Sequence, residues 1–149
     1  MENQEKTRKM KGFDREIAEE SYRNMQISLS LLSSKDITIL GSVIIYLKDQ
    51  KKLNYHEIGI TINRDERNIR TLYLLARERQ LEAEEEKIET EISIPISIFA
   101  AEKISALESI TVYLHDKLEL RFSEIAGLLQ RDQRTIWTVY HRARKKTVE

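Results

Sequence analysis

Residues 27–77 read ISLSLLSSKDITILGSVIIYLKDQKKLNYHEIGITINRDERNIRTLYLLAR, and residues 94–144 read IPISIFAAEKISALESITVYLHDKLELRFSEIAGLLQRDQRTIWTVYHRAR. The two stretches align without a gap at an offset of 67 residues, and about 19 of the 51 aligned positions are identical. A repeat of this length indicates one supersecondary unit used twice. We therefore expect the fold and the function to belong to a module of about 50 residues.

The composition is typical of a helical protein in water. Charged residues make up 34% of the 149 residues and hydrophobic residues 40%, which is close to the average for globular domains. No apolar run approaches the roughly 18 residues that a membrane span needs. The chain has no cysteine, which excludes disulfides and thiolate metal sites. We expect a cytoplasmic protein with no membrane span, no metal and no cofactor.

The formal net charge of zero hides two segments of opposite charge. Residues 81–93 contain six glutamates and one lysine, a net charge of −5, whereas residues 121–149 contain seven basic and three acidic residues, a net charge of +4. A local basic face is what nucleic-acid binding needs. Similar blocks of charge also occur on ordinary solvated helices, so charge alone does not decide the function.

The repeat divides the chain into five segments. We predict a charged N-terminal tail over 1–26, a first repeat over 27–80, an acidic linker over 81–93, a second repeat over 94–146 and a tail over 147–149. The N-terminal tail is either mobile or contains a weak helix over 14–25. The linker is expected to be helical, because strong helix formers continue through it.

Each repeat is expected to contain a short extended segment and three helices. Apolar residues alternate at 27, 29 and 31 and again at 94, 96 and 98, which indicates two strands. These runs pair with each other or across a dimer, or else they lie extended over the core. The first helix has apolar residues at helical spacing from Ile37 to Leu47, and Ser34 and Asp36 are its expected caps.

The second half of each repeat has the outline of a helix-turn-helix. A short helix over 55–62 or 122–129 is followed by a break at Asn63-Arg64 or Gln130-Arg131, where many such motifs have glycine. Asp65 and Asp132 are expected to cap the last helix of each repeat. The crossing point of the two helices needs a small residue, and Gly59 and Ala126 occupy it. The expected fold class is all-α, with two tandem trihelical helix-turn-helix modules, each preceded by a short extended or β segment.

The segment FSEIAGLLQRDQRTIWTVYHRARKK, residues 122–146, resembles the helix-turn-helix of the region-4 class of sigma factors and related sigma-like regulators. The resemblance is carried by the pattern S-E-I-A-x-L-L, a short turn, R-T-I-x and a basic end. Residues 55–79, YHEIGITINRDERNIRTLYLLARER, match the same pattern more weakly. The resemblance implies a trihelical DNA-binding module that reads promoter-like DNA.

The last helix of each repeat is therefore the expected recognition helix, whose outward residues meet the major groove. Arginine pairs bidentately with guanine, and glutamine or asparagine with adenine. Arginines in the turn suit phosphate contacts. The candidate DNA-binding residues in the second repeat are Arg131, Gln133, Arg134, Thr135, Trp137, Thr138, His141, Arg142, Lys145 and Lys146, and those in the first repeat are Arg64, Arg67, Asn68, Arg70 and Thr71.

Alternatives remain for several of these residues. Arg67 and Arg134 are placed either at the DNA or in ion pairs with Glu57 and Glu124. Trp137 either contacts DNA or packs against the other repeat or a second chain. The first repeat is expected to be the weaker DNA reader, since it has glutamate and leucine where the second repeat has Gln133 and His141.

The predicted function is sequence-specific binding of double-stranded DNA, with transcriptional regulation as its purpose. The alternative is a protein–protein adaptor whose repeats have lost DNA binding. An enzyme is not expected, because the three histidines show no metal-ligand spacing and the four glycines are isolated,. Double-stranded DNA is the expected partner, and a homodimer and a contact with RNA polymerase or another protein are left open.

Overall fold

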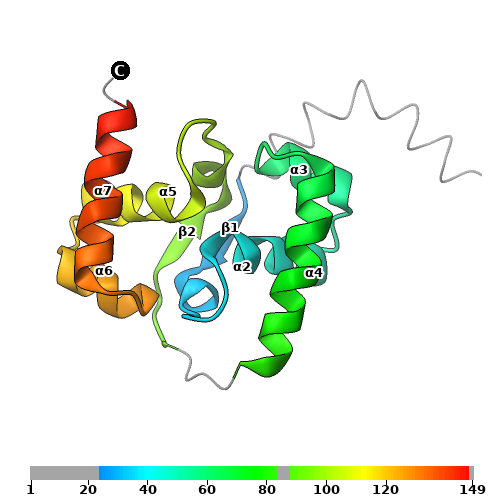
Figure 1. Cartoon of the computed structure of the whole chain (residues 1–149), viewed down its shortest axis with the longest axis horizontal. Helices are drawn as coiled ribbons and strands as arrows, with labels where there is room; N and C mark the ends of the chain where they lie inside the picture. Colours follow the sequence, from blue (N-terminus) through cyan, green and yellow to red (C-terminus); the bar gives the residue numbers. More distant parts are fainter. Residues whose placement is uncertain (1–23, 84–87, 148–149) are drawn as a thin grey trace, which may run out of the picture.

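The computed structural model describes residues 24–83 and 88–147. These residues are mostly helical, with six α-helices and one two-stranded sheet (Figure 1). This agrees with the expected all-α class at the level of overall content. Most of the predicted tail 1–26, including residues 14–23 of the weak helix predicted over 14–25, lies outside the described residues, as does most of the tail 147–149.

The two repeats contain the same elements in the same order. Repeat 1 consists of β1 (Gln26–Ser28), α2 (Ile39–Ile45), α3 (Tyr55–Thr61) and α4 (Glu66–Glu82). Repeat 2 consists of β2 (Ser93–Pro95), α5 (Ala106–Val112), α6 (Phe122–Leu129) and α7 (Gln133–Thr147). A 3₁₀ turn follows each strand, over Leu29–Leu32 and Ile96–Ala100, and a π-helical turn extends α2 over Tyr46–Gln50 and α5 over Tyr113–Lys117.

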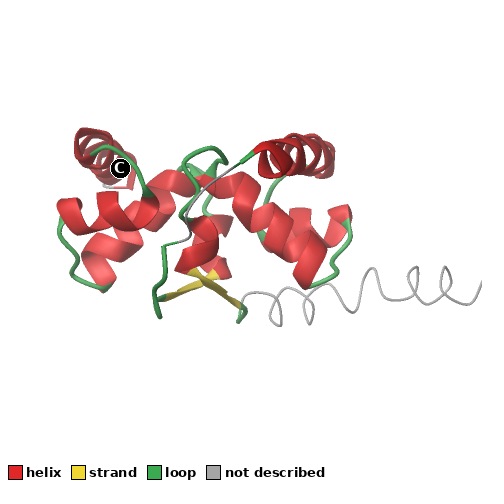
Figure 2. Cartoon of the chain, turned by 90° about the horizontal axis from the view of Figure 1, so that it is seen from below, coloured by secondary structure: helices red, strands yellow, loops and turns green. Residues whose placement is uncertain are grey.

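A pseudo-two-fold axis relates the repeats through their strands. β1 pairs antiparallel with β2, and Ile27 lies opposite Ile94, its own counterpart at the 67-residue offset. The amide of Leu29 donates to the carbonyl of Ile92, and the equivalent amide of Ile96 donates to the carbonyl of Met25, both at 2.9 Å. Of the arrangements left open by the sequence, pairing of the two runs with each other is therefore confirmed. Figure 2 shows this ribbon on one side of the molecule.

The strands are shorter than the alternating pattern indicated. Each run leaves the sheet after three residues and enters a 3₁₀ turn. In repeat 1 the hydroxyl of Ser28 accepts a hydrogen bond from the amide of Ser30 and so caps this turn. The apolar residues at 29 and 96 consequently point into the core from the turn rather than from a strand.

One hydrophobic core serves both repeats. The side chains of Ile27, Leu29, Ile94 and Ile96 are fully buried. They belong to a single cluster that also contains core residues of both helical units, among them Ile44, Leu47, Ile110 and Leu114. Burial of each such side chain is worth about 1.5–3 kcal/mol. The extended segments thus join two small helical units into one body.

The breaks between the last two helices also connect the repeats. Asn63 and Gln130 adopt left-handed backbone conformations with φ of 54° and 51°. The side-chain nitrogen Nδ2 of Asn63 donates to the carbonyl of Ala100 at 3.3 Å, and the side-chain nitrogen Nε2 of Gln130 donates to the carbonyl of Ser33 at 2.7 Å. Glycine would adopt this φ more readily, but it has no side-chain donor. The unusual break residues therefore act as symmetric links between the repeats.

The crossing point of α3 and α4 is tight, as the small residues there predicted. Gly59 is buried, and a Cβ atom at this position would lie 2.7 Å from the carbonyl oxygen of Arg64. Repeat 2 has the buried Ala126 at the same position. The break after α3 therefore approaches its helix more closely than a side chain allows.

The first helix of each repeat starts later than predicted. Thr38 caps α2, because its hydroxyl accepts from the amide of Gly41 at 2.9 Å. Ser34 instead accepts from the amides of Asp36 and Ile37 in the preceding turn. The prediction that Ser34 and Asp36 cap this helix was wrong, because the chain makes one more turn before α2 begins.

The acidic linker is helical only at its start. α4 continues to Glu82, but residues 88–92 are not helical and Ser93 begins β2. The chain must be extended here to enter the two-stranded sheet, so tertiary pairing overrides the helix propensity of the glutamates. The helical prediction for 81–93 is therefore wrong over 88–93, and residues 84–87 lie outside the described part of the chain.

The shared core predicts that neither repeat folds stably alone. Fragments 1–83 and 88–149, prepared separately, should show little cooperative thermal unfolding, since each exposes the apolar residues of its extended segment. Mixing them should restore helical circular dichroism and a sharp transition. Two separate fragments that melt as sharply and as high as the intact chain would contradict the shared core.

Candidate nucleic-acid interface

The two expected recognition helices lie on the same side of the molecule. Figure 2 shows α4 and α7 opposite the β-ribbon, and Figure 1 shows that they run in opposite directions, as the pseudo-two-fold axis requires. Each helix packs one side against its own repeat and leaves the other side exposed. The exposed sides of α4 and α7 are therefore the candidate interface.

α7 presents a polar and basic outer face. Its inner side is formed by Ile136, Val139 and Ala143, all buried. The carboxylate of Asp132 accepts from the amide of Arg134 at 2.7 Å, which confirms the predicted cap. The residues predicted to contact DNA from this helix are all exposed: Gln133, Arg134, Thr135, Trp137, Thr138, His141, Arg142, Lys145 and Lys146.

A repeated clamp of three side chains fixes the last helix of each repeat. The hydroxyl of Tyr140 donates to a carboxylate oxygen of Asp116 at 2.8 Å, and Arg144 lies 3.7 Å from the other oxygen. Repeat 1 contains the same arrangement. The hydroxyl of Tyr73 donates to one carboxylate oxygen of Asp49 at 2.7 Å, and Nε of Arg77 lies 3.6 Å from the other. Tyr73 and Tyr140 therefore each hold the last helix of their repeat in place.

The clamp also affects the ionisation of the tyrosines. The hydrogen bond to Asp49 raises the pKa of Tyr73, and burial, followed by the bond to Asp116, raises the pKa of Tyr140. Both phenols therefore stay neutral and keep donating at physiological pH. The hydrogen bonds by which these tyrosines hold α4 and α7 therefore persist at physiological pH.

Two cations of α7 face a buried carboxylate that the sequence did not single out. Lys146 Nζ lies 3.0 Å from one oxygen of Glu108, and Arg142 Nε lies 3.7 Å from the other. The side chain of Glu108 is only 3% exposed. Burial raises the pKa of Glu108, but hydrogen bonds from the amide and hydroxyl of Ser105 and from Lys146 outweigh it, so the pKa lies below its usual value.

Glu108 therefore anchors the basic end of α7 to α5. The sequence does contain one indication of this role: Glu108 occupies the position where repeat 1 has the buried glycine Gly41. Arg142 and Lys146 stabilise the fold in addition to any contact with a phosphate. Lys145, between them in sequence, is exposed.

Both turn arginines donate hydrogen bonds to carbonyls of the chain itself. The guanidinium of Arg131 donates to the carbonyls of Ser34 at 2.8 Å and Ile37 at 3.2 Å, both in repeat 1, and to that of Leu129 at 3.0 Å. Arg131 thus connects the two repeats, because the break that contains it packs on the other repeat.

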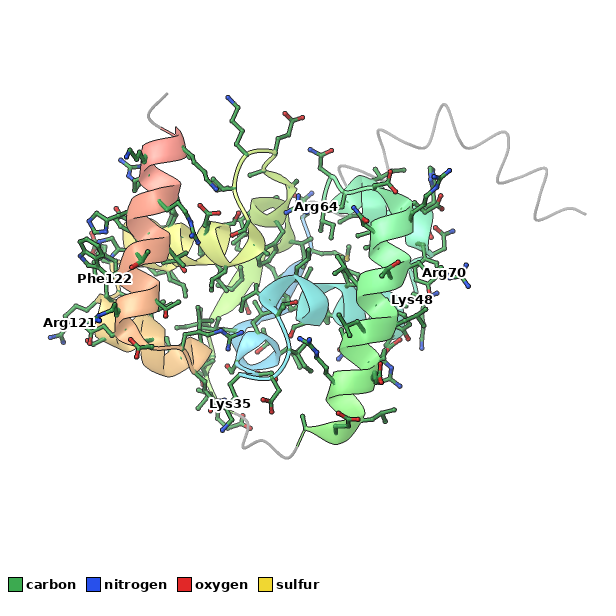
Figure 3. The ribbon with its side chains drawn as sticks, viewed as in Figure 1. Lys35, Lys48, Arg64, Arg70, Arg121 and Phe122 are labelled. Carbon is green, nitrogen blue, oxygen red and sulfur yellow. The ribbon has the colours of Figure 1, made fainter. Side chains whose placement is uncertain are left out.

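Arg64, the counterpart of Arg131, is also drawn into the structure. Its guanidinium donates to the carbonyls of Ile62 at 3.3 Å and Asn63 at 3.4 Å. Burial lowers its pKa, although arginine remains charged at physiological pH. Figure 3 shows Arg64 at the N-terminal end of α4. The phosphate contacts predicted for Arg64 and Arg131 stay predictions.

Aromatic residues cover one edge of α7. The ring of Trp137 stacks on His141 of the same helix, with centroids 4.0 Å apart, and remains 52% exposed. Beneath them Phe122, labelled in Figure 3, stacks on His115 at 4.4 Å. Trp137 therefore packs on its own helix, which differs from the predicted alternative of packing against the other repeat.

The ion pair that was the alternative for Arg134 is made by another residue. Glu124 pairs with Arg121 at 3.2 Å, and hydrogen bonds from the amide and side chain of Arg121 lower the pKa of Glu124. Arg134 is exposed on the first turn of α7. Its side chain is thus placed for an external partner.

α4 presents a different outer face. The predicted contact residues Arg67, Asn68, Arg70 and Thr71 are exposed near its start. Farther along, Leu74, Leu75 and Leu81 are 55%, 43% and 80% exposed. The counterparts of Leu74 and Leu75 on α7 are His141 and Arg142. α4 and α7 therefore have equivalent places in the fold but different outer surfaces.

Comparison with protein-family models, with curated proteins and with solved structures finds no match to this chain. The resemblance of residues 122–146 to region 4 of sigma factors accordingly stays a prediction. Over 24–83 and 88–147, none of the helices combines the length and the apolar character that crossing a bilayer takes.

The anchor at Glu108 predicts a pH-dependent contribution to stability. Glu108→Gln should lower the free energy of unfolding at pH 7 by about 1–3 kcal/mol, because Lys146 and Arg142 lose their charged partner. The pKa of Glu108 is depressed by folding, so the wild type has this stabilisation above the unfolded-state pKa and loses it as pH falls through the folded-state pKa. Denaturant titrations at pH 7 and pH 3 should show the difference between variant and wild type shrinking at pH 3. A difference that is equal at both pH values would show that the charge of Glu108 does not matter.

Proposed function

We propose that this chain binds double-stranded DNA sequence-specifically through α7 and regulates transcription. On this proposal each repeat is a helix-turn-helix module, formed by α3 and α4 or by α6 and α7 on a first helix, and α7 enters the major groove. The observation that carries the proposal is the outer face of α7, where Arg134, Thr138, His141 and Lys145 are all exposed on the side opposite the core.

The contacts that fix α7 in place support a role in recognising DNA sequence. Asp132 caps its start, the Asp116 clamp fixes its middle and Glu108 anchors its end. A helix held at three points presents its side chains with little loss of freedom on binding. Arg134 and Gln133 on the first turn have the chemistry to pair with guanine and adenine. Lys145 and the exposed parts of Arg142 and Lys146 have the chemistry to contact phosphates.

α4 supports the same function less strongly. Arg67 and Thr71 are identical to Arg134 and Thr138 at the equivalent positions, so the first turns of both helices share part of their chemistry. Glu66 and the exposed leucines oppose close approach to a phosphate backbone. Contacts of Arg67, Asn68, Arg70 and Thr71 with DNA are therefore secondary in this proposal, and the exposed leucines favour a protein contact instead.

The proposal predicts electrostatic binding by the second repeat. Each phosphate neutralised lowers the slope of log affinity against log salt by roughly 0.9, and the exposed cations of α7 allow roughly two to four such contacts. Titrating a randomised duplex by fluorescence anisotropy from 50 mM to 200 mM salt should give a slope of about −2 to −4. Absence of binding at low salt, or a flat slope, would favour the adaptor alternative.

The proposal also predicts different effects for substitutions of Arg134 and Lys145. Arg134→Ala should lose about 1–3 kcal/mol on a selected DNA site and little on random DNA, because a base contact carries sequence information. Lys145→Ala should weaken binding to both DNAs by similar factors, because a phosphate contact carries none. Arg67→Ala, at the equivalent position of α4, is the matched control and should have the smaller effect. Equal losses on both DNAs for Arg134→Ala would show that Arg134 only positions the protein.

A further inference from the structure

The outer face of α4 is ordered by chemistry along the helix. Arg67 and Arg70 lie toward its N-terminus, Leu74 and Leu75 follow, and Glu78 and Leu81 lie toward its C-terminus. Arg70, Leu74, Glu78 and Leu81 share one side at helical spacing. This side is opposite the buried Ile69 and Ala76. The face is therefore basic at one end, apolar in the middle and acidic toward the other end.

Such a face is complementary to itself in the antiparallel orientation. A two-fold axis through Leu74 brings Leu74 against its own copy and places position 70 of one helix opposite position 78 of the other. Arg70 then faces Glu78 of the second helix, and Glu78 faces Arg70, so two ion pairs flank the apolar contact. Leu81 meets the aliphatic part of Arg67, which can pack on it while its charge stays in water.

The corresponding face of α7 is not complementary to itself. In the same register, an antiparallel copy of α7 would place Lys145 opposite Trp137 and His141 opposite its own copy, so the contact would contain no ion pair. Lys145 occupies the position in α7 that Glu78 occupies in α4, so α7 has a positive charge where the α4 dimer requires a negative one. The complementarity is thus specific to α4.

We propose that the exposed face of α4 is a homodimer interface, in which α4 of one chain packs antiparallel on α4 of a second copy. Leu74 forms its apolar centre, Arg70 and Glu78 form its flanking ion pairs, and Leu81 packs on Arg67 of the second copy at each end. Figure 3 shows Arg70 on the outer side of α4, pointing away from the rest of its own chain. One helix of 17 residues is roughly 25 Å long, so the interface is small and the dimer is reversible. The interface leaves α7 of each chain exposed.

Charge-reversal variants test this geometry with the intact chain. Sedimentation velocity over a concentration series should show wild type passing from monomer to dimer. Arg70→Glu and Glu78→Arg should each weaken self-association by about tenfold or more, because each variant puts like charges opposite each other twice. An equimolar mixture of the two variants should form a heterodimer about as tightly as wild type, since both contacts become complementary again.

Further variants separate the interface from general effects. Leu74→Asp should abolish the dimer, and circular dichroism should show that it still folds, because this side chain is exposed. Lys145→Glu, the equivalent position on α7, should leave the dimer unchanged. A wild type that stays monomeric at all concentrations, a mixture that does not associate, or an equal effect of Lys145→Glu would each overturn the proposal. None of these outcomes depends on DNA, so the dimer can fail while the proposed DNA binding stands.

Discussion

The pairing of Ile27 with Ile94 across the pseudo-two-fold axis is the contact on which the rest of the structure depends. Each helical unit is too small to bury a sufficient core alone, and the extended segments supply the missing apolar surface in the middle. Because each strand pairs with its own repeat copy, the hydrogen bonds on either side of the axis are equivalent: Leu29 to Ile92 and Ile96 to Met25. The chain thus encloses within itself the symmetry that two identical subunits would otherwise provide.

The two repeats share the contacts that hold their helices in place, and this allows their outer surfaces to differ. Residues that hold the frame are the same in both repeats, including the aspartate, tyrosine and arginine of each clamp and the aspartate that caps each last helix. Residues on the outer faces are different: α7 has His141 and Arg142 where α4 has exposed leucines. A homodimer could not make this distinction, because both copies would change together. The two proposed roles, DNA binding for α7 and protein contact for α4, correspond to this difference between the outer faces.

Much of the frame could be predicted from the sequence because its signals are local. The gapless repeat gave equivalent elements, helical spacing located α3, α4, α6 and α7, and the small residues at 59 and 126 marked the crossing points. The capping role of Asp65 and Asp132 also follows from neighbouring residues. The exposure of the predicted contact residues on α7 followed from the same periodicity.

The errors arose where distant parts of the chain meet. The hydrogen bonds of Arg131 to Ser34 and Ile37 could not be predicted, because only the fold brings these carbonyls to it. The linker was expected to be helical because it is rich in strong helix formers. Its last residues are extended only because Ser93–Pro95 pairs with β1. Glu108 carried a local signal, since a glutamate replaced a glycine in the repeat, but its partners on α7 are 34 and 38 residues away in sequence.

Native-state hydrogen exchange tests the shared frame most directly. The amides of Leu29 and Ile96, which bond across the axis, should exchange only through global unfolding, together with core amides of α2, α3, α5 and α6. All of them should report one free energy of opening, and this should fall equally in both repeats when denaturant is added. Two separate free energies, one for each repeat, with rapid exchange at Leu29 and Ile96, would show that the repeats are independent and would contradict the account.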